Sequence, residues 1–257
     1  MVDTDNPTGE TILPAVAALF PQRRVVSFSN REDFFVFFSI VAELVEPGFT
    51  VLDLGAGRGR TAEFGGPHKR WLGTLKGRCA KLIGMDVDPV VLENPYVDEA
   101  HLIGPDGRLP VPDASIDLIY SFVTIEHVDQ PEAFAAEVER VLKPGGWFCA
   151  WTPNKWGYIA VGARMVPNRL HVKLLRTIAP RDREDVDVFP TRYRMNTIGA
   201  IRRLFPGSRF RNYSYTFNAD PVYNFGSPIV AALILFVMAL TPPPLKQSLI
   251  VLVRKNP

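Results

Sequence analysis

Cysteine and histidine are scarce in this chain, and their scarcity excludes two kinds of site. The 257 residues include two cysteines and four histidines. Cys79 and Cys149 are too few for a disulfide framework, so reduced thiols and a cytoplasmic protein are expected. No spaced group of His, Cys and Asp suggests a metal site, and none is expected. The first residues also lack the charged-then-apolar pattern of a secretory signal.

The chain also lacks an excess of charge of either sign. Its 29 Lys and Arg against 27 Asp and Glu give a formal net charge of +2, which gives no reason to expect nucleic acid as a partner. Acids are unevenly spread, because none occurs from Arg140 to Arg181 or from Val188 to Ala219. The basic residues there are interpreted either as solvated surface or as a rim that attracts an anionic substrate or membrane.

The most informative stretch that is present runs from Val51 to Gly59. An apolar run closes on Asp53, and glycines then fall at alternate positions, 55, 57 and 59. Glycine lets a ligand approach the backbone closely, because it has no Cβ. A second apolar stretch, 81–86, also ends on an acid, Asp86. Neighbouring parallel strands that both end in carboxylates predict one crevice, at the edge where open α/β sheets bind ligands.

The glycine spacing indicates which kind of ligand this crevice holds. A dinucleotide fingerprint, Gly-x-Gly-x-x-Gly, places a pyrophosphate on a helix N-terminus. Here the third glycine comes one residue early, and Arg60 holds the place of the fingerprint glycine. Asp53 would repel a phosphate but accept a hydrogen bond from a cationic amine. The pattern therefore favours a ligand with a positive head and a ribose.

The chain resembles the class I S-adenosylmethionine-dependent methyltransferases, in particular the small-molecule group related to quinone and lipid methyltransferases. The resemblance covers roughly residues 40–155 and the last strand. It implies S-adenosylmethionine as the cofactor and a small-molecule acceptor, either lipid-like or a glycan or natural-product intermediate. The motifs that carry it are 51–59, Asp86 with Val87, 109–119, 121–128 and 141–147.

The resemblance also implies which residues hold the cofactor. The spacing from Asp106 to Leu109 is one residue shorter than usual in the family, which leaves the adenine contact open. The implied contacts are Asp53, Gly55, Ala56, Gly57 and Gly59 around the methionine part, Asp86 on the ribose hydroxyls, Val87 on the adenine face, Asp106 and Gly107 at the adenine edge, and Ser121, Phe122 and Val123 facing the sulfonium and the acceptor.

Acceptor chemistry is expected after the fourth and fifth strands. His127 is the candidate general base, because an imidazole accepts a proton at neutral pH; the alternative is that it caps a helix or orients the loop. The candidate acceptor pocket consists of Trp151, Asn154, Trp156 and Tyr158, with packing of the following insertion as the alternative.

The resemblance implies a Rossmann-like α/β fold with a seven-stranded, mostly parallel sheet, helices on both faces and an antiparallel last strand. Four segments are expected: a helical segment 1–48, a cofactor-binding core 49–155, a helical insertion 156–195 on the acceptor side, and the rest of the sheet, 196–257, with an apolar insertion 225–245. Expected strands are 50–54, 81–86, 101–103, 117–122, 147–152, 210–217 and 247–254, with a turn at 143–146.

The apolar insertion contains the run 229–240, which is apolar on every side. Its length of about 12–14 residues is short of the roughly 20 that span a bilayer. Two interpretations remain open. The run is a helix buried in the core or in a homodimer interface, or it is a flap that dips into a membrane surface and admits a lipid-like acceptor. The second interpretation places a cytoplasmic protein peripherally at the inner face of the membrane.

Two other classes of function are weighed against methyl transfer. A nicotinamide-dependent oxidoreductase is disfavoured by Arg60 and by the missing dinucleotide fingerprint. A cofactor-binding scaffold without turnover is disfavoured because Asp53, the glycines and Asp86 are all present.

Overall fold

The computed structural model describes residues 19, 29, 31–59, 66–158, 160–161, 190–221 and 227–257. One mixed sheet organises these residues, in the order β3-β2-β1-β4-β5-β8-β6, with β7 also paired to β8. Most of the insertion expected at 156–195 and of the segment expected at 1–48 lies outside the described residues. The strands are β1 Thr50–Leu54, β2 Lys81–Asp86, β3 Glu99–Leu102, β4 Ile116–Phe122, β5 Leu142–Pro153, β6 Phe210–Asn212, β7 Tyr215–Phe217 and β8 Ser248–Lys255.

The first five strands are parallel and the last three are antiparallel to their neighbours. β1 pairs in parallel with β2 and β4, β2 with β3, and β4 with β5. β8 runs antiparallel to β5, β6 and β7. This arrangement confirms the mostly parallel Rossmann-like sheet. The carboxyl ends of β1, β2, β4 and β5 therefore lie along one edge, where ligands bind in such sheets.

The expected number of seven strands was wrong, because the sixth strand is divided. Asn212 accepts a hydrogen bond from Ser214 N at 2.9 Å, which turns the chain between β6 and β7. Ser214 Oγ then accepts from Leu252 N at 3.0 Å, so a side chain replaces a backbone carbonyl in the ladder. Polar side chains that bond locally compete with a strand in this way.

A second difference concerns residues 143–146, which were expected as a turn before the fifth strand. They lie within β5, and the pairing with β4 is irregular between Ile116 and Leu118. Gly145 has φ +79, a conformation that glycine adopts without steric cost. The sequence therefore makes a bulge in a continuous strand rather than a separate turn.

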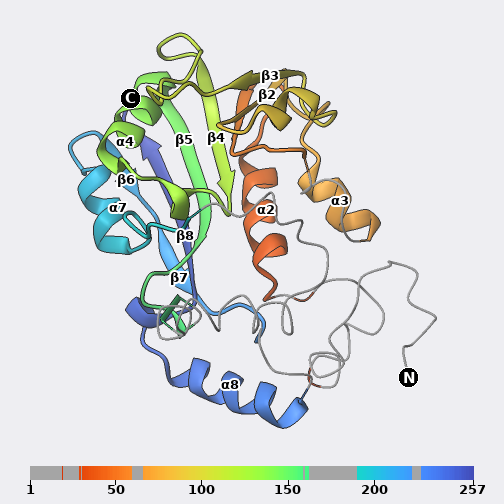
Figure 1. The fold of residues 1–257 in the computed structure, drawn as a ribbon, viewed down its shortest axis with the longest axis vertical. Helices are drawn as coiled ribbons and strands as arrows, with labels where there is room; N and C mark the ends of the chain where they lie inside the picture. The colour runs from red at the N-terminus through yellow and green to blue at the C-terminus, as the bar shows by residue number, and fades with distance from the viewer. Residues whose placement is uncertain are drawn as a thin grey trace.

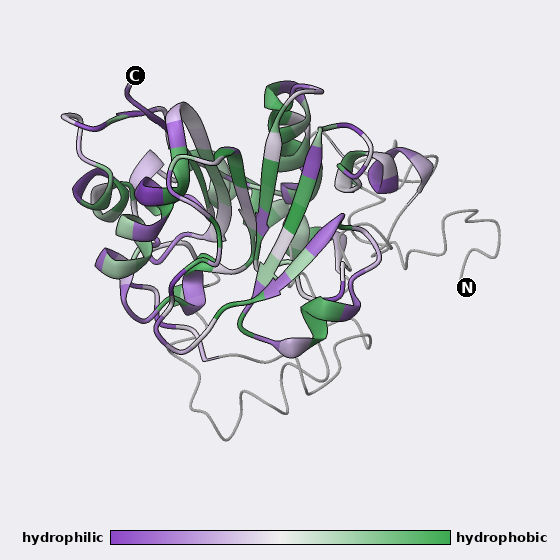
Figure 2. Ribbon diagram, turned by 90° about the horizontal axis from the view of Figure 1, so that it is seen from above, coloured by the Kyte–Doolittle hydropathy of each residue, from purple (hydrophilic) through white to green (hydrophobic). Residues whose placement is uncertain are grey.

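Helices cover both faces of the sheet (Figure 1). On one face lie α2 Asp33–Leu44 and α3 Pro67–Gly73, and on the other lie α4 Pro131–Val141 and α7 Ile198–Leu204. Two apolar clusters fill the spaces between the layers, and Figure 2 shows hydrophobic strands enclosed between the helices. Phe34, Phe37 and Phe38 of α2 are buried, so these aromatic side chains pack in the core.

The apolar run forms helix α8, Pro228–Leu240, outside these layers (Figure 1). Ser227 Oγ caps its first turn by accepting from Val230 N at 3.4 Å. Only Ala231 and Met238 of the helix are buried, so the expectation of a helix buried in the core was wrong. Within the described ranges, no helix has the length and apolar character needed to cross a bilayer.

Candidate functional site

The turn after β1 is hydrogen-bonded to the end of β2. Gly55 N donates to Met85 O at 2.7 Å, and Gly57 N donates to Asp86 Oδ2 at 3.0 Å. Asp86 Oδ1 accepts from Asp88 N at 3.0 Å. These bonds fix the Asp86 carboxylate beside the glycine turn, and each oxygen keeps a further lone pair for a ligand donor. The ends of β1 and β2 are therefore hydrogen-bonded to each other at one edge of the sheet.

Two glycines of the turn are required by its geometry. Gly55 has φ +88, and a Cβ there would lie 2.1 Å from Thr124 Oγ1. Gly59 has φ +80, and a Cβ there would lie 2.5 Å from Tyr96 Cδ2. Gly57 differs, because the nearest atom to its Cβ position is Asp86 Oδ2 at 3.9 Å. The open space lies over Gly57, which fits a ligand that crosses the turn there and reaches Asp86.

Asn94 also supports the turn, and no sequence motif indicated this residue. It follows the short helix η3, Pro89–Glu93, and its side chain is buried. Its Nδ2 donates to Ala56 O at 3.2 Å and to Gly57 O at 3.1 Å. No local motif marks such a residue, because its partners lie far away along the chain.

Asp53 is buried below the same turn. Burial raises the pKa of its carboxyl group to about 7, against a hydrogen bond from Tyr120 that lowers it, and the charge of Asp86 adds to the rise. A carboxylate in this state gains strongly from a nearby cation. The environment therefore suits a ligand with an amine, which is the chemistry expected from the sequence.

The residues expected around adenine lie further along the same edge. Val87 directly follows β2 and is 59% exposed, so its side chain is open to a flat ring. Asp106 and Gly107 lie in an exposed turn after β3, where Asp106 Oδ1 accepts from Arg108 N at 3.2 Å and Gly107 has φ +71.

The end of β4 carries unusual features at all three expected positions. Ser121 Oγ is buried and has no hydrogen-bond partner among the described residues. The ring centre of Phe122 lies 5.0 Å from that of Trp151. Val123 has φ +59, which is a strained conformation for a β-branched residue. Unsatisfied and strained groups concentrate at functional sites.

A second carboxyl group, Asp33, is partly buried beside Trp151 of β5 and was missed in the sequence. Its Oδ1 accepts from Trp151 Nε1 and from Ser248 Oγ, both at 2.8 Å. Burial raises the pKa of Asp33 to about 7, although these two hydrogen bonds lower it, and the nearby Glu32 and Asp220 raise it further. Asp33 does not follow a strand, so no sequence motif indicated it.

His127 lies in the short helix η4, Ile125–His127, after β4. Its Nδ1 is 3.3 Å from the carbonyl oxygen of Pro190. A carbonyl only accepts, so this contact assigns the ring proton to Nδ1 and leaves Nε2 as the acceptor in the neutral ring. The neighbouring Glu126 is buried and accepts from Thr152 Oγ1 at 2.9 Å, which anchors η4 to β5.

The four residues expected to form one acceptor pocket lie in different places. Trp151 is buried beside Phe122, whereas Trp156 is 50% exposed. Asn154 is buried, and its Nδ2 donates to Pro244 O at 2.9 Å and to Lys246 O at 2.7 Å. Its amide therefore joins this loop to the chain after α8. Tyr158 lines a separate pocket below α8.

Residues 52–150 match the model of a family described as a methyltransferase domain. The match identifies this part of the chain as a methyltransferase domain. The glycine turn, Asp53 and Asp86 all lie inside the matched range.

Relatives of this methyltransferase domain have names of the same kind. A probable S-adenosylmethionine-dependent methyltransferase of Mycolicibacterium smegmatis is 31% identical over 60% of this chain and 57% of its own length. A malonyl-[acyl-carrier protein] O-methyltransferase of Yersinia pestis is 30% identical over 38% of this chain and 34% of its own. The chain thus spans about half the length of the mycobacterial relatives it matches.

A solved structure agrees with the fold of the methyltransferase domain and extends beyond it. An S-adenosylmethionine-dependent methyltransferase from Archaeoglobus fulgidus superposes with a TM-score of 0.54 at 15% identity, covering 93% of this chain and 99% of its own. At this identity the likeness concerns the fold alone.

Proposed function

We propose that this protein is a methyltransferase that moves a methyl group from S-adenosylmethionine to a small-molecule acceptor. The observation that carries the proposal is the shared edge at the ends of β1 and β2, where the glycine turn and Asp86 are held together by the bond from Gly57 N. In this proposal Asp53 attracts the amine, Asp86 accepts from the ribose hydroxyls, and Val87 packs on the adenine. Ser121, with its unpartnered hydroxyl, and Val123 face the sulfonium.

Methyl transfer from a sulfonium is an in-line displacement, so the chain contributes mainly by alignment and by excluding water. Phe122 and Trp151 supply an apolar wall on the acceptor side, with ring centres 5.0 Å apart. The bond from Val123 N to Trp151 O, 3.1 Å, holds the strained backbone of Val123 beside this wall. These groups support a site that orients an acceptor and keeps solvent out.

His127 is proposed as the general base for an oxygen or carbon acceptor. The contact with Pro190 O supports this role, because it assigns the ring proton to Nδ1 and makes Nε2 the acceptor nitrogen of the neutral ring. His127→Ala should lower turnover about 10²–10⁴-fold while cofactor affinity stays unchanged. Radiolabelled methyl transfer and calorimetric titration measure the two quantities. Unaltered turnover in His127→Ala would assign the residue to the loop structure instead.

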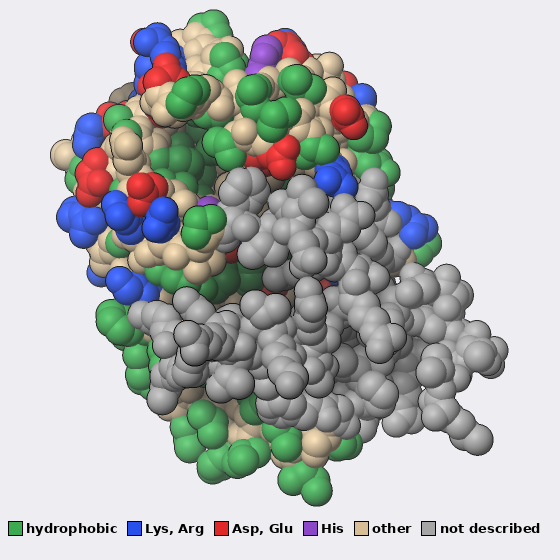
Figure 3. Space-filling view, viewed as in Figure 1, with side chains coloured by type: hydrophobic (Ala, Val, Ile, Leu, Met, Phe, Trp, Pro, Cys, Tyr) green, Lys and Arg blue, Asp and Glu red, His purple; other side chains and the backbone are tan. Residues whose placement is uncertain are grey.

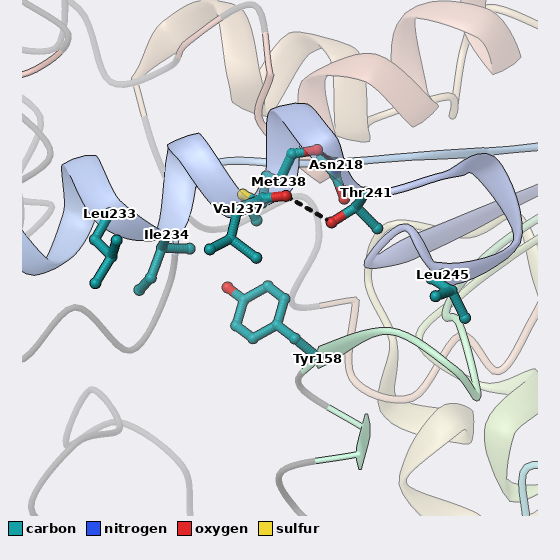
Figure 4. A pocket seen from close by; sticks show the side chains of 8 residues that line it. All are labelled: Tyr158, Asn218, Leu233, Ile234, Val237, Met238, Thr241 and Leu245. Carbon is teal, nitrogen blue, oxygen red and sulfur yellow. Dashed lines mark hydrogen bonds between the residues drawn. The ribbon is translucent and has the colours of Figure 1, made fainter.

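An acceptor with an apolar tail is proposed from the pocket below α8 (Figure 4). The pocket has a volume of about 230 Å³ and is lined chiefly by apolar side chains of α8 on one side and by Tyr158 on the other. Tyr158 belongs to the loop after β5, on the acceptor side of the sheet. A relative named sterol 24-C-methyltransferase, 31% identical over 40% of this chain, agrees with such an acceptor class. We place this reaction in a cytoplasmic protein that works peripherally at the inner face of a membrane.

The test of the function is a pair of titrations followed by a transfer assay. S-adenosylmethionine should bind in calorimetry and NAD should not, because no fingerprint for a pyrophosphate is present. Binding of NAD instead would favour the oxidoreductase. Tritium-labelled cofactor is then incubated with long-chain acids, prenylated phenols and sterols. Cofactor binding without transfer to any of them would favour a cofactor-binding scaffold or a glycan acceptor.

A further inference from the structure

Helix α8 exposes a continuous apolar stripe. Its large exposed residues recur at intervals of three and four, so they share one helical face. Hydrophobic side chains accordingly gather over α8 at the lower end of the molecule (Figure 3). The stripe consists of Ile229, Leu233, Phe236, Val237 and Leu240, which are 82%, 61%, 63%, 54% and 69% exposed.

The opposite face of α8 is fixed to the protein. Ala231 and Met238 are buried there, and Asn218 Nδ2 donates to Met238 O at 2.7 Å. Thr216 Oγ1 of β7 donates to Pro243 O at 2.5 Å, which anchors the chain just after the helix. The helix therefore presents its stripe outward on a firm base. α8 itself has no polar residue from Pro228 to Leu240. The polar surface next to the stripe is therefore supplied by the part of the protein on which the helix packs.

The surroundings of the stripe carry the side chains that favour a bilayer interface. Trp156 is 50% exposed, with Lys155 Nζ 5.7 Å from its ring centre. The hydrogen bonds from Asn154 to the carbonyl oxygens of Pro244 and Lys246 join the segment that contains Lys155 and Trp156 to the chain after α8. No acid occurs from Pro221 to Pro257. Tryptophan and lysine suit the headgroup level of a membrane, and the lack of acids removes repulsion from anionic lipids.

We infer that α8 is a membrane-docking helix, which lies along the surface of an anionic bilayer with its stripe below the headgroups and Trp156 and the lysines at headgroup level. A second copy of the chain fits the stripe less well, because protein interfaces carry about ten hydrogen bonds and a polar rim. The α8 side chains offer no donor or acceptor, and three consecutive prolines, 242–244, follow the helix. The inference rests on the proposed function in one respect only, namely that the membrane supplies an acceptor with an apolar tail.

Flotation of the full chain with vesicles tests the inference without cofactor or acceptor, so its outcome is separate from that of the transfer assay. The wild type should float with vesicles of equimolar phosphatidylcholine and phosphatidylglycerol, and less with phosphatidylcholine alone. The double variant Leu233→Ser, Phe236→Ser should bind on the order of 100-fold more weakly, since two apolar side chains no longer insert. Lys246→Gln should weaken binding roughly fivefold on the anionic vesicles only.

Leu92→Ser is the matched control, because Leu92 is 59% exposed, like Leu233, but lies in η3. It should float as the wild type does, and all variants should keep the wild-type circular dichroism spectrum because the changed side chains are exposed. The inference is overturned if the wild type stays at the bottom of the gradient with anionic vesicles. It is also overturned if the double variant floats normally, or if sedimentation shows a dimer that the double variant abolishes.

Discussion

The proposed cofactor side and the proposed acceptor side of the sheet edge each contain a carboxyl group whose pKa is raised by burial, but they draw on the chain differently. Asp53 and its partners come from β1, β2 and β4, with the glycine turn directly after Asp53. Asp33 comes from the first turn of α2, and its partners Trp151 and Ser248 lie 118 and 215 residues further along. The first site can be complete once β4 has formed, whereas the second also needs the last strand, β8.

This difference predicts how each side responds to substitution. The cofactor side depends on backbone conformation, so a single methyl group can block it. The proposed acceptor side depends on the hydrogen bonds of the Asp33 side chain. A substitution there should therefore remove these hydrogen bonds and the titration of Asp33 while the backbone conformation is kept. The two carboxyl groups share a pKa of about 7, which makes them a matched pair for experiments.

The largest effect is expected for Gly55→Ala. The new Cβ would meet Thr124 Oγ1 at 2.1 Å in a backbone with φ +88. We expect cofactor binding to fall below detection and the free energy of unfolding to drop by about 2–4 kcal/mol. Calorimetry and urea unfolding measure the two effects. Gly48→Ala is the control, because nothing lies within 4 Å of its Cβ position, and it should change stability by less than about 1 kcal/mol. Equal behaviour of the two variants would contradict the structural role of the turn.

Next in size are Asp33→Asn and Asp53→Asn, compared across pH. Both carboxyl groups have a pKa raised to about 7 by burial, against about 3.9 in the unfolded chain. Their protonated forms therefore stabilise the fold fully below about pH 4, and this contribution is lost as pH rises through about 7. The free energy of unfolding of the wild type should therefore fall between about pH 4 and pH 7. In each variant this fall should be smaller by about 1–3 kcal/mol. Urea unfolding at several pH values gives the slopes, and unchanged slopes would mean that neither acid is protonated in the folded chain.

Cofactor titration separates these two variants. Only ionised Asp53 attracts the amine, so wild-type affinity for S-adenosylmethionine should rise with pH through about 7, the pKa of this group. Asp53→Asn should remove that rise, whereas Asp33→Asn should keep it. If both variants bind the cofactor alike at every pH, the division into a cofactor side and an acceptor side is wrong.

A similar or smaller effect is expected for Asp86→Ala. The change removes the acceptor proposed for two ribose hydroxyls and should weaken cofactor binding by about 1–3 kcal/mol. It also removes the partner of Gly57 N, so stability is measured alongside affinity. Asp106→Ala, in an exposed turn, should cost less than about 1 kcal/mol. An affinity unchanged by Asp86→Ala would reject its ribose role, and a larger loss from Asp106→Ala would place the adenine contact there.

The parts of the molecule that could be predicted from the sequence are those governed by neighbouring residues. The first two strands, the glycine turn and the acids that end the strands follow from short patterns, as do the Thr197 cap of α7 and the proline-started α4. Asp33 could not be found this way, because its burial depends on Trp151 and Ser248. The division of the sixth strand depends on where Ser214 meets Leu252. The exposure of α8 depends on how the helix packs against the other described residues, which composition does not reveal.

The position of β8 in the sheet has a consequence for biosynthesis. Of the strands in this sheet β8 is synthesised last, yet it lies between β5 and β6 and also pairs with β7. Until it emerges, the apolar edge of β5 lacks this partner, and an unpaired edge is a template for aggregation. The donor Ser248 begins the same strand. The nascent chain can therefore form the glycine turn early, but it completes the pairing of Asp33 only after β8 has been synthesised.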